Sequence, residues 1–186
     1  MAEEADGIIG EGVMPAGPTL NVVQAVSWRR ALAFLVMSFL LYSCLAAVWS
    51  EDLSHFLIDV LTVQPAAFLA RALSGDPSVI AEGSHIRSQQ AVINVLFGCD
   101  GTDVALLLLA ALLVSPLRWR YRLLGMLAGL ALVFVLNQLR VVGLFLALRT
   151  EPNWFGPLHS MLAPMLLVLG LGIFYLLWLR RFNRTG

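Results

Sequence analysis

The sequence contains no lysine, only two cysteines, and charged residues that make up just 13% of its 186 residues. A soluble domain carries roughly 25% charged residues, about twice this share. Hydrophobic residues instead make up 59% of the chain, and the mean hydropathy is +0.83. Because so little polar surface cannot cover a globule in water, the composition predicts an all-α integral membrane protein.

These shortages exclude several classes of protein and site. The formal net charge of +0 argues against a nucleic-acid binder that works by neutralising phosphates. Cys44 and Cys99 are too few for a disulfide scaffold or a thiolate metal cluster. The three histidines are scattered without metal-ligand spacing, so no metal and no cofactor are expected.

Four apolar runs are candidates for about four transmembrane helices: residues 31–49, 104–117, 123–148, which Arg140 interrupts, and 160–179. A bilayer core of about 30 Å needs about 20 helical residues. The first and fourth runs fit this length, and the third can tilt. The second has 14 residues. It crosses only if Arg118 reaches back to the interface and residues 99–103 lie at the outer one.

The arginines indicate the orientation of these spans. Eight lie at one set of ends: Arg29, Arg30, Arg118, Arg120, Arg122, Arg180, Arg181 and Arg184. Three lie at the other: Arg71, Arg87 and Arg149. The positive-inside rule therefore places both termini in the cytoplasm. Residues 1–27 are acidic and contain glycine and proline, so they predict a mobile cytoplasmic tail before a membrane domain at 28–182.

A cleaved signal peptide is the alternative for the first run. Arg29 and Arg30 precede an apolar stretch, and residues 41–44 loosely resemble a lipoprotein cleavage box. The run is long for the apolar region of a signal peptide, however, and its cleavage would leave an odd number of spans. A retained helix is therefore favoured.

Residues 50–103 are predicted to face outward, as is a short loop at 149–159. Leu53, Phe56, Leu57, Val60 and Leu61 have the spacing of an external amphipathic helix that lies on the membrane. Pro65 is expected to interrupt this helix. Residues 79–81, 85–87 and 91–97 predict a short β-hairpin or small sheet that leads into the second span.

Arg140 is the strongest functional signal, because it interrupts the third apolar run. An arginine inside a membrane helix costs at least about 2.5–3.5 kcal/mol on insertion scales, so it suggests a functional site. The alternative is a structural arginine that pairs with an acid or with helix carbonyls, or that snorkels outward to the interface.

Cys99 and His159 stand at the outer starts of the second and fourth runs. Cys99 lies between Gly98 and Gly101, at a helix N-terminus that favours a thiolate, while Asp100 and Asp103 oppose one. Each residue has a simpler interpretation, the cysteine as a small buried residue and the histidine as a polar anchor. The topology nevertheless places both at the depth of Arg140, and a nucleophile, a base and a cation are the minimum set for acyl transfer.

Three segments carry a family resemblance: residues 94–101 (NVLFGCDG), 137–144 (NQLRVVGL) and 158–160 (LHS). In this order they resemble the motifs of the exosortase/archaeosortase family, over about residues 28–182, with the compact type called exosortase H as the nearest form. The resemblance implies a Cys–Arg–His triad with Cys99 as nucleophile, Arg140 as oxyanion-stabilising residue and His159 as acid and base. Neighbouring motif residues Asn137, Gly101 and Ser160 are candidates for substrate contact.

The resemblance also implies the reaction and the partners. Such an enzyme is a membrane cysteine protease or transpeptidase in a bacterial inner membrane, with its active site on the outer side. Its substrates are exported proteins with a C-terminal sorting signal made of a short motif, a hydrophobic helix and a basic tail. A surface polymer is a possible acceptor. The alternative is a non-enzymatic scaffold, channel or transporter subunit, in which Arg140 contacts ions or lipid headgroups.

The arginine distribution makes a topological prediction. A reporter that is active only outside the cytoplasm should work when fused after Ser74 or Asn153, and should fail after Trp119 or Gly186. Activity of the fusion at Trp119 would contradict the orientation, because Arg118, Arg120 and Arg122 are its central support.

Overall fold

The computed structural model describes residues 28–182, so the expected tail at 1–27 lies outside the described residues. The elements in chain order are α1 (Trp28–Val48), α2 (Glu51–Ser54), the π-helix η2 (His55–Val63), α3 (Gln64–Ser74), β1 (Ile80–Glu82), β2 (His85–Arg87), β3 (Val92–Asn94), α4 (Thr102–Leu113), α5 (Trp119–Thr150), α6 (Pro152–Pro157), the π-helix η3 (Leu158–Leu162) and α7 (Ala163–Phe182).

Within residues 28–182, four helical stretches are long and apolar enough to cross a membrane: Trp28–Val48, Glu51–Ser74, Trp119–Thr150 and Pro152–Phe182. The prediction of a mainly helical, multi-pass membrane protein with a small sheet is thereby confirmed. One of these four stretches is not among the spans that the sequence predicts. Helix α4 has 12 residues and is only about 18 Å long, which is shorter than a bilayer core. The second stretch of sufficient length is instead Glu51–Ser74, from α2 to α3.

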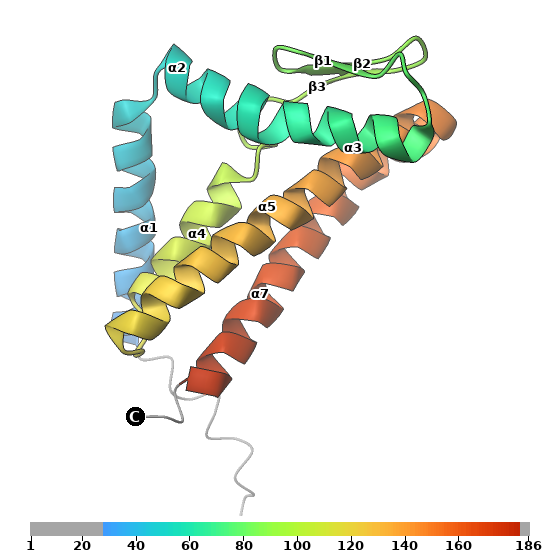
Figure 1. Cartoon of the computed structure of the whole chain (residues 1–186). Helices are drawn as coiled ribbons and strands as arrows, with labels where there is room; N and C mark the ends of the chain where they lie inside the picture. Colours follow the sequence, from blue (N-terminus) through green and yellow to red (C-terminus); the bar gives the residue numbers. More distant parts are fainter. Residues whose placement is uncertain (1–27, 183–186) are drawn as a thin grey trace, which may run out of the picture.

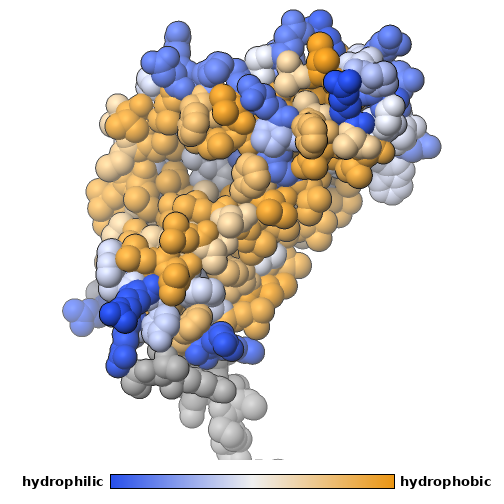
Figure 2. All heavy atoms as spheres, in the orientation of Figure 1, coloured by the Kyte–Doolittle hydropathy of each residue, from blue (hydrophilic) through white to orange (hydrophobic). Residues whose placement is uncertain are grey.

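The stretch from α2 to α3 does not run alongside the other long helices. Figure 1 shows it lying across the upper ends of α1, α4 and α5. The opposite end of the molecule contains the junction between α4 and α5, the start of α1 and the end of α7. Figure 2 shows an apolar band between two hydrophilic ends, as expected for a protein surrounded by lipid. The transverse helix therefore lies at one edge of this band, where an interfacial helix was predicted.

One of the two hydrophobic cores forms where α4 and α7 pack closely against α5. A Cβ on Gly125 would lie 2.6 Å from Nε1 of Trp178, and one on Gly129 would lie 2.6 Å from Cδ2 of Leu108. The two glycines therefore let neighbouring side chains lie directly on the α5 backbone. Small residues at such contacts are typical of membrane helices, where association depends on packing and interhelical hydrogen bonds.

The transverse helix continues through Pro65, so the predicted interruption is wrong. Proline has no N–H, and in an α-helix it deprives the carbonyl four residues earlier of its donor. Here that carbonyl is Leu61, and Nε2 of Gln138 on α5 donates to it at 3.0 Å. The preceding π-helical turns include a bond from Oγ1 of Thr62 to the Leu57 carbonyl at 2.9 Å. Local rewinding and a tertiary hydrogen bond thus accommodate the proline.

The carbonyl at the C-terminal end of α4 also receives a hydrogen bond from a side chain. Arg122 donates from Nε to the Leu117 carbonyl at 2.9 Å and from Nη1 to the Leu113 carbonyl at 2.8 Å. A helix end leaves its last carbonyls without intrahelical donors, and water is scarce near a bilayer. This arginine therefore stabilises the short α4 and its turn into α5.

The three strands form one antiparallel sheet in the order β1-β2-β3. Ile86 of β2 pairs with Ala81 of β1 and with Ile93 of β3. Ile86 and Ile93 are buried in a second core with η2, α3 and the outer part of α5. The expected hairpin is thus a three-stranded sheet, and it packs over the outer end of the bundle.

The prediction of a loop at 149–159 is wrong, because nearly all of these residues are helical. Helix α5 extends to Thr150, and only Glu151 separates it from a second helical stretch that runs from Pro152 to Phe182. Pro152 begins α6, where the missing proline N–H costs no intrahelical hydrogen bond. His159 therefore lies within a continuous helical stretch rather than after a loop.

Gly129→Val should destabilise the protein, because its side chain would meet Leu108 and Phe174 in a close-packed core. Overpacking of this kind typically costs about 1–3 kcal/mol. Gly172→Val is the matched control, since nothing lies within 4 Å of a Cβ at that helical glycine. Thermal unfolding in detergent should show a lower midpoint for Gly129→Val only, and equal midpoints would contradict the packing.

Candidate active site

Cys99, Arg140 and His159 line one cavity of about 210 Å³. The cysteine comes from the turn before α4, the arginine from α5 and the histidine from η3. Residues of β3 and Phe155 form much of the remaining wall. The three residues that the sequence selected are therefore brought together, although 41 positions separate the first two along the chain.

The turn that carries Cys99 depends on two glycines. Gly98 and Gly101 have φ values of 86° and 85°, in the left-handed region that other residues rarely adopt. The Cys99 amide donates to the Leu96 carbonyl at 2.9 Å. The cysteine is half-buried and packs against the outer core. A substitution at either glycine would strain the backbone beside the thiol.

Asp100 helps to build this turn. Its Oδ1 accepts a hydrogen bond from the Gly98 amide at 3.0 Å, and its Oδ2 accepts one from the Thr102 hydroxyl. The carboxylate next to Cys99 is thus occupied with its own loop. Two donors of this loop thus share the carboxylate that lies next to the thiol in the sequence.

Arg140 is half-buried and forms no hydrogen bond or ion pair with any residue between 28 and 182. The structural alternative, an arginine paired with an acid or a carbonyl, therefore finds no partner in the described chain. Arg140 borders the cavity with Cys99 and also a second, apolar cavity. A cation without a partner in such surroundings is suited to an anion that arrives from outside.

The ring of His159 is oriented by packing. It stacks on Phe155, with ring centroids 5.5 Å apart and an angle of 5° between the planes. Its Nδ1 atom is buried and has no hydrogen-bond partner in the described residues. In many catalytic sites a third polar group orients the base, whereas here an aromatic face fixes the plane of the imidazole.

An ion pair holds the sheet over this cavity. Nη2 of Arg149, near the end of α5, lies 3.0 Å from Oδ2 of Asp76, and its Nε donates to Oε1 of Gln90 at 2.6 Å. Hydrogen bonds from the Ser78 hydroxyl and amide lower the pKa of the Asp76 carboxyl, and Arg149 adds to the effect. Because Gln90 precedes β3, the pair fixes the strand that forms the cavity wall.

The three candidates for substrate contact lie outside the cavity lining. Asn137 is only 2% exposed, and its side chain would be 3.1 Å from a Cβ on Gly101. These two residues pack the Cys99 turn against α5, one helical turn before Arg140. Ser160 is exposed and its hydroxyl donates to the Gly156 carbonyl at 2.8 Å.

Sequence reasoning missed the residues that support the site. Phe155 precedes His159 by four positions, which is the spacing of neighbours on a helix. That signal was hidden because the segment was expected to be a loop. Arg149 was counted only for orientation, and nothing in the local sequence pairs it with Asp76.

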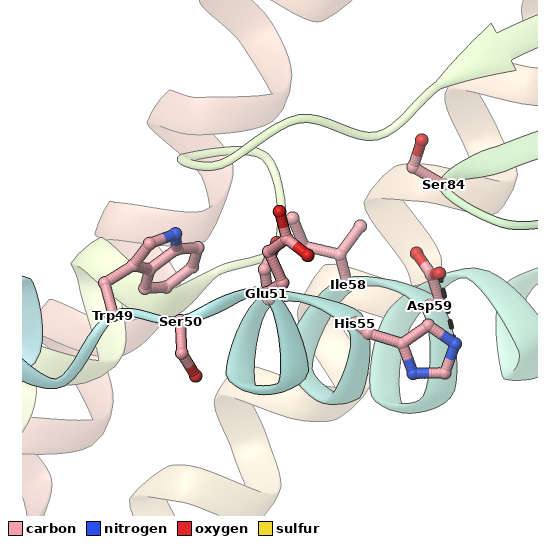
Figure 3. Close-up of a pocket in the computed structure, with 8 residues that line it drawn as sticks. Trp49, Ser50, Glu51, His55, Ile58, Asp59 and Ser84 are labelled. Atoms are coloured by element: carbon pink, nitrogen blue, oxygen red, sulfur yellow. Dashed lines mark ion pairs between the residues drawn. The ribbon is translucent and has the colours of Figure 1, made fainter.

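A larger cavity of about 570 Å³ lies between the transverse helix and the β1–β2 turn. Figure 3 shows His55 and Asp59 one turn apart on that helix, with Ser84 across from them. Nε2 of His55 lies 3.6 Å from Oδ2 of Asp59, in an ion pair when the histidine is protonated. None of the three predicted site residues lines this cavity, and residues 28–182 contain no cluster of metal-ligating side chains.

No model of a known protein family matches the chain, and neither the curated proteins nor the solved structures contain a match. The resemblance to exosortases therefore depends on the three short motifs.

The two cysteines should differ in reactivity. Cys99 lines the cavity, whereas Cys44 is exposed on the surface of α1, one of the helices long and apolar enough to cross a membrane. The predicted orientation puts the cavity outside the cytoplasm. An impermeant maleimide added to intact cells should label Cys99 only, because lipid shields Cys44. Detergent should expose both. Labelling of Cys44 alone would contradict the placement of Cys99.

Proposed function

We propose that this protein is a membrane-embedded cysteine protease or transpeptidase of the exosortase type. It cleaves C-terminal sorting signals of exported proteins at the outer face of a bacterial inner membrane. The observation that supports the proposal best is that Cys99, Arg140 and His159 border the same cavity. The order of the three motifs along the sequence adds to this support.

Each side chain has one role in the proposed reaction. His159 takes the thiol proton of Cys99, and the sulfur attacks the scissile carbonyl carbon. Arg140 stabilises the negative oxygen of the tetrahedral intermediate, where a preorganised donor is worth roughly 2.7–4 kcal/mol. His159 then protonates the leaving amine as the C–N bond breaks, and a thioester remains on Cys99.

The second half of the reaction returns the enzyme to its first state. An acceptor, either water or an amine such as one on a surface polymer, gives a proton to His159 and attacks the thioester. The C–S bond breaks and the sulfur regains its proton. The apolar wall of β3 and Phe155 limits water around the intermediate, which favours transfer over hydrolysis.

The substrate partner follows from the same resemblance. An exported protein with a hydrophobic helix near its C-terminus would diffuse within the bilayer and present its recognition motif to the outer cavity. The eight arginines at the opposite ends of the spans support a location of this cavity outside the cytoplasm, in line with the positive-inside rule.

A non-enzymatic scaffold, channel or transporter subunit is the second candidate. The unpaired Arg140 favours it, because a cation in a membrane helix also suits an ion path or a lipid contact. It does not explain why a thiol and an imidazole share a cavity with that arginine.

Co-expression with a candidate substrate tests the proposal. The substrate should carry a short motif, a hydrophobic helix and an arginine-rich tail. Wild type should remove the tail, and Cys99→Ala should leave it intact, as a mass shift on a gel will show. Cys44→Ala is the matched control and should process normally, because that thiol lies away from the cavity. Equal processing by Cys99→Ala and wild type would contradict the role of Cys99 as the nucleophile.

Substitutions at Arg140 separate catalysis from structure. Arg140→Ala should lose at least about 10²-fold in turnover, as for a missing oxyanion donor. Arg140→Lys should also lose most turnover, because a point charge does not replace the planar fork of donors. Folded yield is measured in parallel. Normal processing by Arg140→Leu would contradict a role of Arg140 in catalysis.

A further inference from the structure

Arg140 borders two cavities, and the proposed reaction uses only one of them. The second, here called the α5–α7 groove, has a volume of about 330 Å³. Its lining consists of apolar residues and Gly143, and Arg140 is the only charged residue in it. Small-molecule sites typically have about this volume and consist of apolar walls with a few polar groups.

The groove opens toward the lipid. Leu139 on α5 and Leu166 on α7 line it and are 62% and 66% exposed, and both helices belong to stretches long and apolar enough to cross a membrane. Gly143 between them leaves open space, since nothing lies within 4 Å of a Cβ there. A hydrocarbon chain can therefore enter sideways from the bilayer without displacing a side chain.

Arg140 lies in the half of α5 that shares a core with the sheet. It follows Arg122, whose side chain donates to the last carbonyl of α4, by 18 residues, or about 27 Å along a helix. The long arginine side chain can extend from this position toward the headgroups at that edge of a bilayer core of about 30 Å. It has no protein partner in residues 28–182. Its charge is therefore available to an anion at this level.

We infer that the α5–α7 groove binds an anionic membrane lipid, with one acyl chain in the groove and the headgroup phosphate at Arg140. A lipid carries a phosphate directly beside its acyl chains, which matches one guanidinium among otherwise uncharged lining residues. A protein helix without an acidic side chain at this position would leave Arg140 unpaired. An arginine–phosphate contact also supplies the charge that the apolar walls do not.

The site shares Arg140 and Leu144 with the cavity of Cys99. The inference does not depend on the proposed reaction, because lipid binding can be measured without a substrate. If the enzyme proposal fails, the groove and its unpaired arginine are unchanged.

Lipid retention tests the inference. The full chain is reconstituted in vesicles of equal parts phosphatidylcholine and phosphatidylglycerol, extracted gently, and examined by native mass spectrometry. Wild type should retain phosphatidylglycerol in preference to phosphatidylcholine. Arg140→Gln should reduce this preference about tenfold or more, as expected for the loss of a charge-assisted hydrogen bond.

Substitutions at two glycines provide a matched pair of variants that tests binding of the acyl chain. Gly143→Leu fills the groove and should abolish retention of both lipids, whereas Gly172→Leu, also in open space on a spanning helix, lines a different pocket and should behave as wild type. Leu166→Trp fills the groove from α7 and replaces Gly143→Leu if that variant does not fold. Unchanged preference in Arg140→Gln, or unchanged retention in a folded variant with a filled groove, would overturn the inference.

Discussion

The structure depends on supplying hydrogen-bond donors to backbone carbonyls where water is scarce. In a bilayer an unsatisfied carbonyl costs several kcal/mol, so every break in a helix needs a partner from the protein itself. Gln138 supplies the Leu61 carbonyl at the proline of the transverse helix. Arg122 supplies the end of α4, and Trp178 of α7 donates to the Tyr121 carbonyl at 3.0 Å. These bonds connect α4, α7 and the transverse helix to α5, which is the central element of the fold.

Helix α5 also unites the candidate site. Its inner half carries the glycines against which α4 and α7 pack, and its outer half carries Asn137, Arg140 and Arg149. Asn137 packs on the turn of Cys99, and Arg149 holds the sheet that forms the wall. One rigid helix thus positions a cation, the turn that carries Cys99 and a cavity wall. Such preorganisation is what an oxyanion-stabilising site requires, because a donor must already be in place when charge develops.

The guanidinium of Arg140 has two proposed roles. It borders a small cavity with a thiol and an imidazole on one side and an apolar, lipid-facing groove on the other. Both surroundings suit an anion, and no acidic side chain in residues 28–182 pairs with it. An unpaired arginine in a membrane helix is energetically costly. In either proposal an anion, a reacting oxygen or a lipid phosphate, would offset this cost.

The sequence by itself determined the membrane class, the main apolar helices, the small sheet and the three residues that share a cavity. Composition and hydrophobic runs are local properties, and the arginine, cysteine and histidine stand at helix positions whose depth follows from topology. Tertiary structure alone decided the path of the helix through Pro65, because its compensating donor, Gln138, comes from a distant helix. It also decided the helical form of 152–157 and the pairing of Arg149 with Asp76. These features depend on contacts between segments far apart in the chain, and no local pattern of residues encodes them.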